Sequence, residues 1–417
     1  MDMNKKIINN FQVFNNFISK LSTKDKKIAS SIKMMYSVHM ENYKDKINFL
    51  FLAKQLTRFV FKFFLILFYK VELVGSDKKL NSGIFKNTNI EEFISKETSI
   101  PIICLKKKIA FNLKFILIFK NMLRIIYFLL IDKSLNKKYI LSLIHRLIDY
   151  EMTYHTVKIP IFKIILFEDD RSPSNLALIH FLRENNVTTV KYDNWLIDPI
   201  NHNEINCEYY YYPSLYHKEI IERFECNREL KYIKGGFLFW DKLSNFKNEA
   251  KKDKYLIIYF TQFSIEIDVH KQYISDIIDT MNKYKIRGKV IVKVHPREEK
   301  SKYQELSNFF DNIEIIDKAY DNYMLISQAN FCFSIFSTVS IEAKHIINNS
   351  YFINYDNIDI VDYNALGLDV IKNKDMLNEV LSECYIPILQ ENFIIRNNCQ
   401  YPNSIKTLQN IINEGKF

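Results

Sequence analysis

The stretch from Tyr255 to Tyr284 reads YLIIYFTQFSIEIDVHKQYISDIIDTMNKY, and the run KVIVKV follows at 289–294. The first six residues are β-branched, aromatic or leucine, which predicts a buried strand at 255–260. From His270 to Tyr284 the apolar residues recur at helical spacing, so this segment is expected to be an amphipathic helix. A helix between two such strands predicts a parallel β–α–β unit.

The same alternation continues outward in both directions. Repeated β–α units imply parallel sheets that are covered on both faces. The 417 residues exceed the usual size of one hydrophobic core, so we expect two Rossmann-like domains, 71–245 and 246–417, that meet in the polar run 242–254. Further strands are expected at 71–75, 100–105, 163–167, 188–192, 313–316, 331–336 and 351–355, with a strand or strand edge at 209–212. Further helices are expected at 175–184, 303–310, 323–328 and 339–347.

Residues 1–70 are expected to form a helical segment at a membrane surface. The stretches Asn48–Leu73 and Phe111–Ile131 are rich in Phe, Leu and Ile, but a Lys or Arg interrupts each of them every few residues. A spanning helix needs about 20 mostly uncharged apolar residues. The interruptions favour helices that lie in the interface, and the alternative is a pair of buried helices whose charged ends reach solvent. The cations concerned are Lys54, Arg58, Lys62, Lys114, Lys120 and Arg124.

Composition excludes several classes of protein. The formal net charge is +10, which favours anionic partners such as lipid headgroups or phosphorylated substrates. Nucleic acid is not expected, because no zinc-finger spacing, RNP motif or arginine-rich arm occurs. The six cysteines are scattered, and the N-terminus has no signal-peptide pattern, so we expect a cytoplasmic protein. No metal or dinucleotide motif occurs, and no cofactor is expected.

Polar, reactive residues follow five of the expected strands. Ligands of open α/β sheets bind at the carboxyl ends of strands, so these residues are candidates for a site. Core packing does not explain five strands that end in this way. The segments are Thr261-Gln262 with Glu266 and Asp268, His295-Pro296-Arg297-Glu298, Ser337-Thr338, Glu168-Asp169-Asp170-Arg171 and Asp193-Asn194-Trp195.

Ser337 and Thr338 precede an expected helix, where two hydroxyls and free backbone N–H groups can bind a phosphate. A simple helix cap is the alternative for this pair. His295 follows a strand 42 residues earlier, which leaves room for two β–α units between the loops. An imidazole beside a phosphate can stabilise or protonate a departing nucleotide. The sequence therefore predicts a phosphate site that both loops share.

The segments YFTQFSIEIDVHKQYI, VKVHPREEK and SIFSTVSIEA resemble, in this order, the bacterial sialyltransferases of the lipooligosaccharide and polysialic-acid capsule groups. The similarity covers about residues 255–345. It implies a GT-B-like fold with a cleft between two Rossmann-like domains, a CMP-activated donor, inversion at the anomeric carbon and no essential metal. The resemblance implies that His295, Ser337 and Thr338 contact the CMP phosphate. Other expected donor-site residues are Thr261, Gln262, Pro296, Arg297 and Glu342.

The N-terminal half departs from this family where an acidic pair followed by Gly is common. Here Asp193-Asn194-Trp195 lacks the second acid and the glycine. The base that accepts the proton of the acceptor hydroxyl is therefore left among several carboxylates. Asp268 and Glu266 rank first, Asp193 follows, and Glu168 or Asp169 are further candidates. Two other acids that could contact ribose or base are Asp317 and Asp321.

The expected function is transfer of sialic acid or a related nonulosonate from a CMP-activated donor to a lipooligosaccharide or capsule glycan. The protein would lie peripherally on the inner face of the cell membrane, and a homodimer is kept open. CMP-Kdo transferases and CDP-glycerol-type polyol-phosphate transferases share the His-Pro motif and remain alternatives. An alternative of another class is a non-catalytic partner in a capsule assembly complex.

Overall fold

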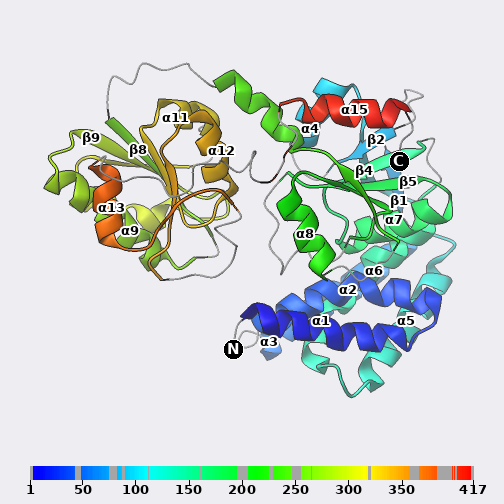
Figure 1. The fold of residues 1–417 in the computed structure, drawn as a ribbon. Coiled ribbons are helices and arrows are strands. Elements are labelled where there is room, and N and C mark those ends of the chain that lie inside the picture. The colour runs from blue at the N-terminus through cyan, green and yellow to red at the C-terminus, as the bar shows by residue number, and fades with distance from the viewer. Residues whose placement is uncertain are drawn as a thin grey trace. The chain divides into compact units, whose positions relative to one another are not determined.

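The chain forms two compact α/β units in the computed structural model (Figure 1). Unit 1 comprises Met1–Pro213, His217–Lys234 and Ile405–Phe417, and unit 2 comprises Ser214–Tyr216 and Gly235–Ser404. The structure describes residues 3–42, 48–74, 82–86, 90–110, 112–158, 162–194, 205–224, 229–246, 255–263, 265–317, 321–356, 366–382, 397, 399 and 402–414.

Unit 1 is built on a seven-stranded sheet with the order β1-β3-β2-β4-β5-β6-β7. From β3 to β7 every neighbouring pair runs parallel, whereas β1 pairs with β3 in antiparallel register. The second half of β3 extends beyond its pairing with β2, and this extension holds β1. The strands are β1 (Tyr69–Val74), β2 (Ser82–Phe85), β3 (Ile102–Ile109), β4 (Ile164–Phe167), β5 (Thr188–Tyr192), β6 (Tyr209–Tyr212) and β7 (Lys231–Lys234).

Helix α6 is the centre of the helical part of unit 1. Most of its side chains are buried, and it packs against α2, α3, α5 and α7. Figure 1 shows α1, α2 and α5 gathered on one side of this unit, with α4 and α15 on the other. The helices are α1 (Met3–Ser19), α2 (Thr23–Asn42), α3 (Phe49–Phe68), α4 (Ile90–Thr98), α5 (Phe115–Ile131), α6 (Lys137–Thr156), α7 (Pro173–Glu184), α8 (Leu215–Phe224) and α15 (Ser404–Glu414).

Unit 2 is built on a six-stranded, fully parallel sheet with the order β10-β9-β8-β11-β12-β13. Apolar side chains of β8, β9 and β11 form its core with those of α9, among them Tyr259, Val292, Phe333 and Ile277. The strands are β8 (Tyr255–Phe260), β9 (Gly288–Lys293), β10 (Ile313–Ile316), β11 (Phe331–Ser334), β12 (Ser350–Ile353) and β13 (Val370–Ile371).

Helices connect the parallel strands of unit 2, as the β–α–β pattern requires. Close packing begins at the first residue of β9, where a Cβ on Gly288 would lie 2.4 Å from the carbonyl oxygen of Tyr255. The helices are α9 (Ile267–Lys283), α10 (Leu306–Phe309), α11 (Asn322–Gln328), α12 (Thr338–Ile346) and α13 (Lys374–Leu381), with 3-10 helices η1 (Leu238–Phe246) and η2 (Lys300–Tyr303).

The strand order of each sheet reverses once. In unit 2 the chain runs outward from β8 through β9 to β10, and then from β11 through β12 to β13 on the other side. In unit 1 the reversal lies between β2 and β4. Ligands of open α/β sheets bind outside the carboxyl ends of the strands at such a switch point. Each unit therefore has one crevice where a ligand is expected.

The expected α/β class is confirmed, with two Rossmann-like units and a helical N-terminal part. Two expectations differ from the structure: β1 is antiparallel, and the helix expected at 303–310 is divided into η2 and α10. Trp195 and residues 247–254 of the polar run lie outside the described residues. Among the helices that the structure describes, none is both long and apolar enough to traverse a bilayer.

Candidate functional site

Three of the motif loops in unit 2 emerge side by side around the switch point. In the sheet register Phe260 at the end of β8 lies opposite Lys293 of β9 on one side and Ser334 of β11 on the other. The loops after these strands carry Thr261-Gln262, His295-Pro296 and Ser337-Thr338, respectively. The structure therefore brings the three motifs to one edge of one sheet.

Thr261 joins the first loop to the second. Its Oγ1 accepts a hydrogen bond from the backbone N–H of His295 at 2.9 Å and donates to the carboxylate of Glu298. The other oxygen of that carboxylate accepts from the Tyr303 hydroxyl at 2.8 Å. Because Thr261 is buried, these bonds fix the backbone of the His-Pro loop against β8.

Gln262 joins the first loop to the third. Its side-chain oxygen accepts a hydrogen bond from the backbone N–H of Phe336 at 2.9 Å, directly before Ser337. Its own backbone is held by the buried ring of His270, whose Nε2 lies 3.1 Å from the Gln262 nitrogen. Burial lowers the pKa of His270, so the ring is held in its neutral form. This histidine supports the loop from inside the core.

The local contacts of His295 define its protonation. Its Nδ1 accepts a hydrogen bond from the backbone N–H of Arg297 at 3.1 Å, so in the neutral ring the proton resides on Nε2. Burial lowers the pKa of the half-buried imidazole, Glu298 raises it and Arg297 lowers it further. The exposed ring of Phe263 lies 5.0 Å from the imidazole and 4.8 Å from the Arg297 guanidinium. His295 can therefore donate from Nε2 without first gaining a proton.

Ser337 is the N-cap of α12, and its hydroxyl accepts from the backbone N–H of Val339 at 3.4 Å. Its own N–H donates to the hydroxyl of Ser334 at 3.1 Å, and Ser334 in turn contacts the hydroxyl of Ser340 at 2.7 Å. Thr338 is the first residue of α12 and is half-buried. The loop thus ends at a helix N-terminus, where the positive end of the helix dipole favours an anion.

Glu342 lies one turn into α12, but its side chain is turned into the interior. It is 5% exposed, and its carboxylate accepts from the Trp240 Nε1 at 2.9 Å and also from Tyr323. Burial raises the pKa of Glu342 to about 7, although these two donors and Lys242 oppose the rise. The carboxylate is therefore already engaged inside unit 2.

Two of the candidate bases lie at the start of α9. Glu266 is the N-cap residue, without a side-chain cap bond, and Asp268 lies in the first turn. Both side chains are exposed. Carboxylates at this position stabilise a helix through its dipole, so the geometry is compatible with a role in helix stability as well as in catalysis.

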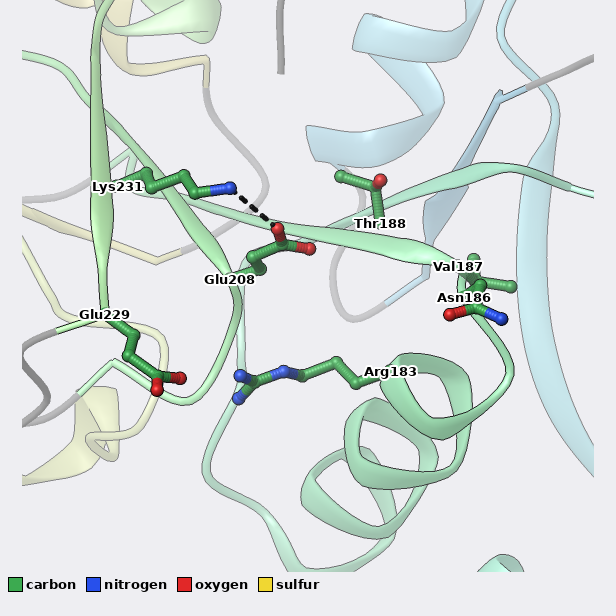
Figure 2. A pocket seen from close by; sticks show the side chains of 7 residues that line it. All are labelled: Arg183, Asn186, Val187, Thr188, Glu208, Glu229 and Lys231. Carbon is green, nitrogen blue, oxygen red and sulfur yellow. Dashed lines mark hydrogen bonds and ion pairs between the residues drawn. The ribbon is translucent and has the colours of Figure 1, made fainter.

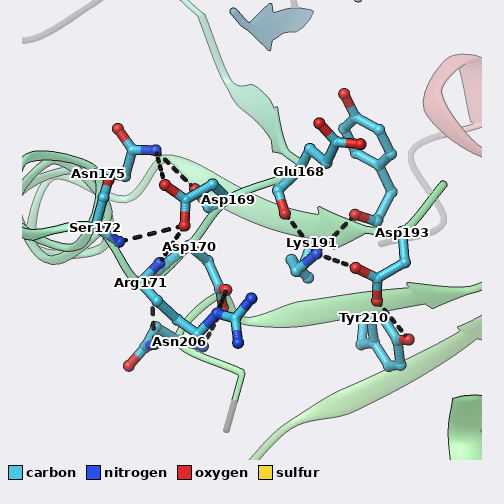
Figure 3. Close-up of polar contacts among 11 residues, drawn as sticks. Glu168, Asp169, Asp170, Arg171, Ser172, Asn175, Lys191, Asp193, Asn206 and Tyr210 are labelled. Atoms are coloured by element: carbon cyan, nitrogen blue, oxygen red, sulfur yellow. Dashed lines mark hydrogen bonds and ion pairs between the residues drawn. The ribbon is translucent and has the colours of Figure 1, made fainter. Parts of the chain in front are cut away.

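The remaining candidate, Asp193, belongs to a buried network in unit 1 (Figure 3). Its carboxylate forms an ion pair with Lys191 and accepts from the Tyr210 hydroxyl at 2.7 Å. The Lys191 ammonium also donates to the backbone carbonyls of Glu168 and Tyr192. Lys191 thus connects the carboxyl ends of β4 and β5.

Glu168 follows β4 and is buried beside this network. Burial raises the pKa of its carboxyl group, the neighbouring Glu91 adds to the rise, and Lys191 opposes it. The Asn194 amide nitrogen lies 3.4 Å from the Glu168 Oε1, whereas the buried Asn194 Oδ1 has no hydrogen-bond partner among the described residues. The acidic run at the end of a strand is the sequence signal for Glu168. Its environment depends on Glu91, which is distant in the sequence.

The loop after β4 continues into a second set of bonds in Figure 3. Asp169 accepts from the backbone N–H groups of Arg171 and Ser172 at 3.0 and 3.2 Å, and from the Asn175 side chain. Asp170 is fully buried and accepts from the Asn206 N–H at 2.6 Å. These bonds shape the entry to α7, so Asp169 and Asp170 are engaged in the loop structure.

A hollow of about 660 Å³ lies at the opposite edge of the unit 1 sheet (Figure 2). Thr188 begins β5, Glu208 directly precedes β6, and Lys231 begins β7, so this is the amino edge of the strands. Lys231 forms an ion pair with Glu208 at 3.1 Å. Ligands of such sheets bind at the carboxyl edge, so this hollow is not the expected site.

Large apolar side chains are exposed on α3, α5 and the segment between β3 and α5, and we call these residues the apolar face. The two helices meet through the rings of Phe63 and Phe119 at 4.8 Å, and the N–H of Ala110 bonds the carbonyl of Phe68. A set of this size marks an interaction surface. Its exposed residues include Phe61, Phe64, Phe68, Ile109, Leu113, Ile116, Leu123 and Tyr127.

Comparisons with known proteins give distant structural likenesses. No protein-family model matches this sequence, and no curated protein matches it. The UDP-GlcNAc 2-epimerase of Neisseria meningitidis, bound to UDP-GlcNAc, has a TM-score of 0.46 and 12% identity, over 80% of this chain and 99% of its own. The wall teichoic acid polymerase TagF with CDPG has a TM-score of 0.43 and 11% identity, over 94% and 98%. The UDP-GlcNAc 2-epimerase of Methanocaldococcus jannaschii with UDP-GlcNAc and UDP has a TM-score of 0.43 and 16% identity, over 60% of this chain and 76% of its own. At such TM-scores these likenesses carry no argument about activity.

Proposed function

We propose that this chain is a glycosyltransferase that uses a nucleotide-activated sugar. The observation that carries the proposal is the junction of three motif loops at the switch point of unit 2, where Thr261 and Gln262 hold the loops together. The motif resemblance supports CMP-activated sialic acid, or a related nonulosonate, as the donor. The acceptor would be a cell-surface glycan.

The donor phosphate would bind at the N-terminus of α12. Two hydroxyls, Ser337 and Thr338, and the helix dipole supply donors and positive potential there. His295, with its proton on Nε2, would donate to a phosphate oxygen. As the bond from the anomeric carbon to the phosphate oxygen breaks, the electron pair stays on the departing CMP. Donors placed in advance stabilise that charge in the transition state, which is where they lower the barrier.

The acceptor hydroxyl would attack the anomeric carbon while a carboxylate takes its proton. Asp268 and Glu266 remain candidates because they follow the Thr-Gln loop, whereas Asp193 is occupied by Lys191 and Tyr210. Glu168 joins the candidates, since burial favours its protonated form and so strengthens it as a base near neutral pH. The mechanism inverts the anomeric centre and needs no metal ion.

Nucleotide-induced stabilisation tests the donor assignment. Wild-type protein and His295→Ala are heated with CMP, CDP, UDP or GDP at equal concentration, and a nucleotide that binds the folded state raises Tm more the tighter it binds. We expect CMP to give the largest rise in wild type and a smaller one in the variant. A preference for UDP or GDP would contradict the proposal, and a preference for CDP would favour polyol-phosphate transfer. If no nucleotide raises Tm, the non-catalytic alternative gains.

We further propose that the apolar face of unit 1 rests on the inner surface of the cell membrane. The exposed Lys54 of α3 and Lys120 of α5 belong to the same helices as its apolar residues, which suits anionic headgroups around an inserted apolar surface. By contrast, Lys62 and Arg124 already form ion pairs with Asp149 and Asp25, so they are poor probes.

The membrane proposal is tested by vesicle flotation with Lys54→Glu/Lys120→Glu. The matched control reverses two exposed lysines of unit 2, Lys300→Glu/Lys372→Glu, and so makes the same change in net charge. We expect wild type and control to bind anionic vesicles in low salt, and the first variant to bind weakly. Equal binding by both variants would contradict the proposal. If the face instead joins two copies, sedimentation will give a dimer that vesicles do not dissociate.

A further inference from the structure

The switch point of unit 1 contains a pocket that the proposed transfer chemistry does not use. Its volume is about 290 Å³, near the lower end of ligand pockets. It opens beyond the carboxyl end of β2 and beside the start of α7, which follows β4. The lining residues are Val71, Phe85, Lys86, Cys104, Leu105, Lys106, Lys107, Asp149, Met152, Thr153, Ser174 and Asn175.

We propose that this pocket binds a phosphate group carried by a small organic ligand or a lipid. The position follows from the topology, because β2 and β4 are adjacent strands from which the chain departs in opposite directions. The proposal concerns unit 1 alone, and it stands whether or not unit 2 transfers a sugar.

The charges that line the pocket favour an anion. Of its three lysines, Lys86 is paired with Glu92 at 2.6 Å, and the one acid, Asp149, is already neutralised by Lys62. Lys106 and Lys107 are exposed and have no ion pair within the described part of the chain. Two lining lysines without an ion pair there favour a positive potential that attracts anions.

The first turn of α7 adds hydrogen-bond donors to the lining of the pocket. Pro173 occupies its first position and has no N–H, and Asp169 takes the N–H groups of Arg171 and Ser172. The backbone N–H groups of Ser174 and Asn175 belong to the first helical turn and have no carbonyl partner within the helix. Ser174, with its hydroxyl, and Asn175 line the same pocket as the lysines.

Several donors from different elements around one pocket suit phosphate better than carboxylate, since phosphate presents three strong acceptor oxygens in different directions. The floor of the pocket is apolar, with Val71, Phe85 and Met152 buried beneath it. A carbon framework attached to the phosphate can therefore rest there. The strand that supplies Lys106 and Lys107 ends at Ile109 of the apolar face, so a lipid headgroup and a soluble phosphate ester are both possible sources.

Cys104 gives a local readout, because it is a free, half-buried thiol that lines the pocket. The full-length protein is treated with iodoacetamide in glycerol 3-phosphate or in sodium chloride of equal ionic strength, and alkylation is measured by mass spectrometry. At ligand concentrations near ten times Kd, alkylation of Cys104 should slow roughly tenfold. Cys399 in unit 2 is also a half-buried thiol, and its rate should not change.

The variant Lys106→Gln/Lys107→Gln should lose this protection. The matched control is Lys108→Gln, which removes an exposed charge from the same strand without lining the pocket. All three lysines are exposed, so both variants should fold. The rate of Cys104 alkylation in the absence of ligand checks that folding is retained. Protection that survives in the double variant, or equal rates in phosphate ester and chloride for wild type, would overturn the proposal.

A second arm separates the two sources of phosphate. Neutral phosphatidylcholine vesicles, with and without phosphatidic acid, replace glycerol 3-phosphate in the alkylation assay. Phosphatidic acid and glycerol 3-phosphate are compared at equal concentration of phosphomonoester. Stronger protection by phosphatidic acid identifies a lipid headgroup, whereas stronger protection by glycerol 3-phosphate identifies a soluble ester. Equal protection by vesicles with and without phosphatidic acid would instead show that the vesicle surface covers the thiol, and would contradict a site for an anionic phosphate group.

Discussion

Replacing Glu342 by glutamine should stabilise unit 2 at neutral and alkaline pH. The carboxyl group is buried, and its pKa in the folded protein is about 7 against a usual value of 4.5. Because the folded pKa is raised, the folded state loses stability as pH rises from about 4.5 to about 7. Below that window the group is protonated in both states, and above it the penalty for ionisation is complete.

The magnitude follows from the separation of the two pKa values. At about 1.4 kcal/mol per pH unit, the ionised group costs the folded state about 3 kcal/mol above pH 7. Glutamine cannot ionise, yet its side-chain oxygen can still accept from the Trp240 Nε1. Glu342→Gln should therefore gain up to about 3 kcal/mol at about pH 8 and nothing at about pH 4.5.

Urea unfolding of wild type and Glu342→Gln over this pH range is the assay. The fluorescence of Trp240 follows unit 2 directly, and Trp195→Phe in both proteins removes the second tryptophan of the chain. A difference in stability that grows with pH is the expected result. A variant that is less stable than wild type at alkaline pH would refute the reasoning, because it would show that the protein stabilises the ionised carboxylate.

The other predictions concern turnover. His295→Ala should lower it about 100-fold or more without a change in Tm, and unchanged turnover would exclude a catalytic role. Turnover of the wild type should rise with pH as the base loses its proton. Glu168→Gln should be slow and lack this rise if Glu168 is the base, and an unaltered profile would return the role to Asp268 or Glu266. Gln262→Ala leaves the N–H of Phe336 without its acceptor, so the Tm rise with CMP should shrink, which thermal shift will measure. Turnover should survive EDTA, and its loss there would show a metal requirement.

The strands of unit 2 could be predicted because each is a short run of β-branched and aromatic residues bounded by polar ones. YLIIYF and FCFSIF are confirmed as strands, the second ending two residues early at Ser334. The strand β2, SGIF, is only four residues long and contains Gly83, and β7, KYIK, is half charged. Neither sequence pattern distinguishes a strand from a loop, so tertiary packing determines that both segments form strands.

The sequence predicts that the site lies at the ends of strands, but it does not predict which residues the side chains of the site contact. The loop motifs follow β8, β9 and β11, which are neighbours in the sheet but not consecutive in the chain. The partner of Glu342 is Trp240, 102 residues away, and no local pattern connects them. Similarly, nothing in the sequence indicates that the Lys191 ammonium is buried and donates to the carbonyl of Glu168, 23 residues away. Long-range pairing of this kind is decided by the packing of the whole unit.

The return of the chain to unit 1 after Ser404 has a practical consequence for cutting the protein apart. Apart from Ser214–Tyr216, unit 2 is an insertion, with one connection after Lys234 and another before Ile405. A single protease cut at either place leaves the halves covalently joined through the other. An expression fragment of unit 2 should run from Gly235 to Ser404. A fragment that ends at Lys234 lacks α15 entirely, and co-expression of residues 404–417 as a separate peptide is the way to restore that helix.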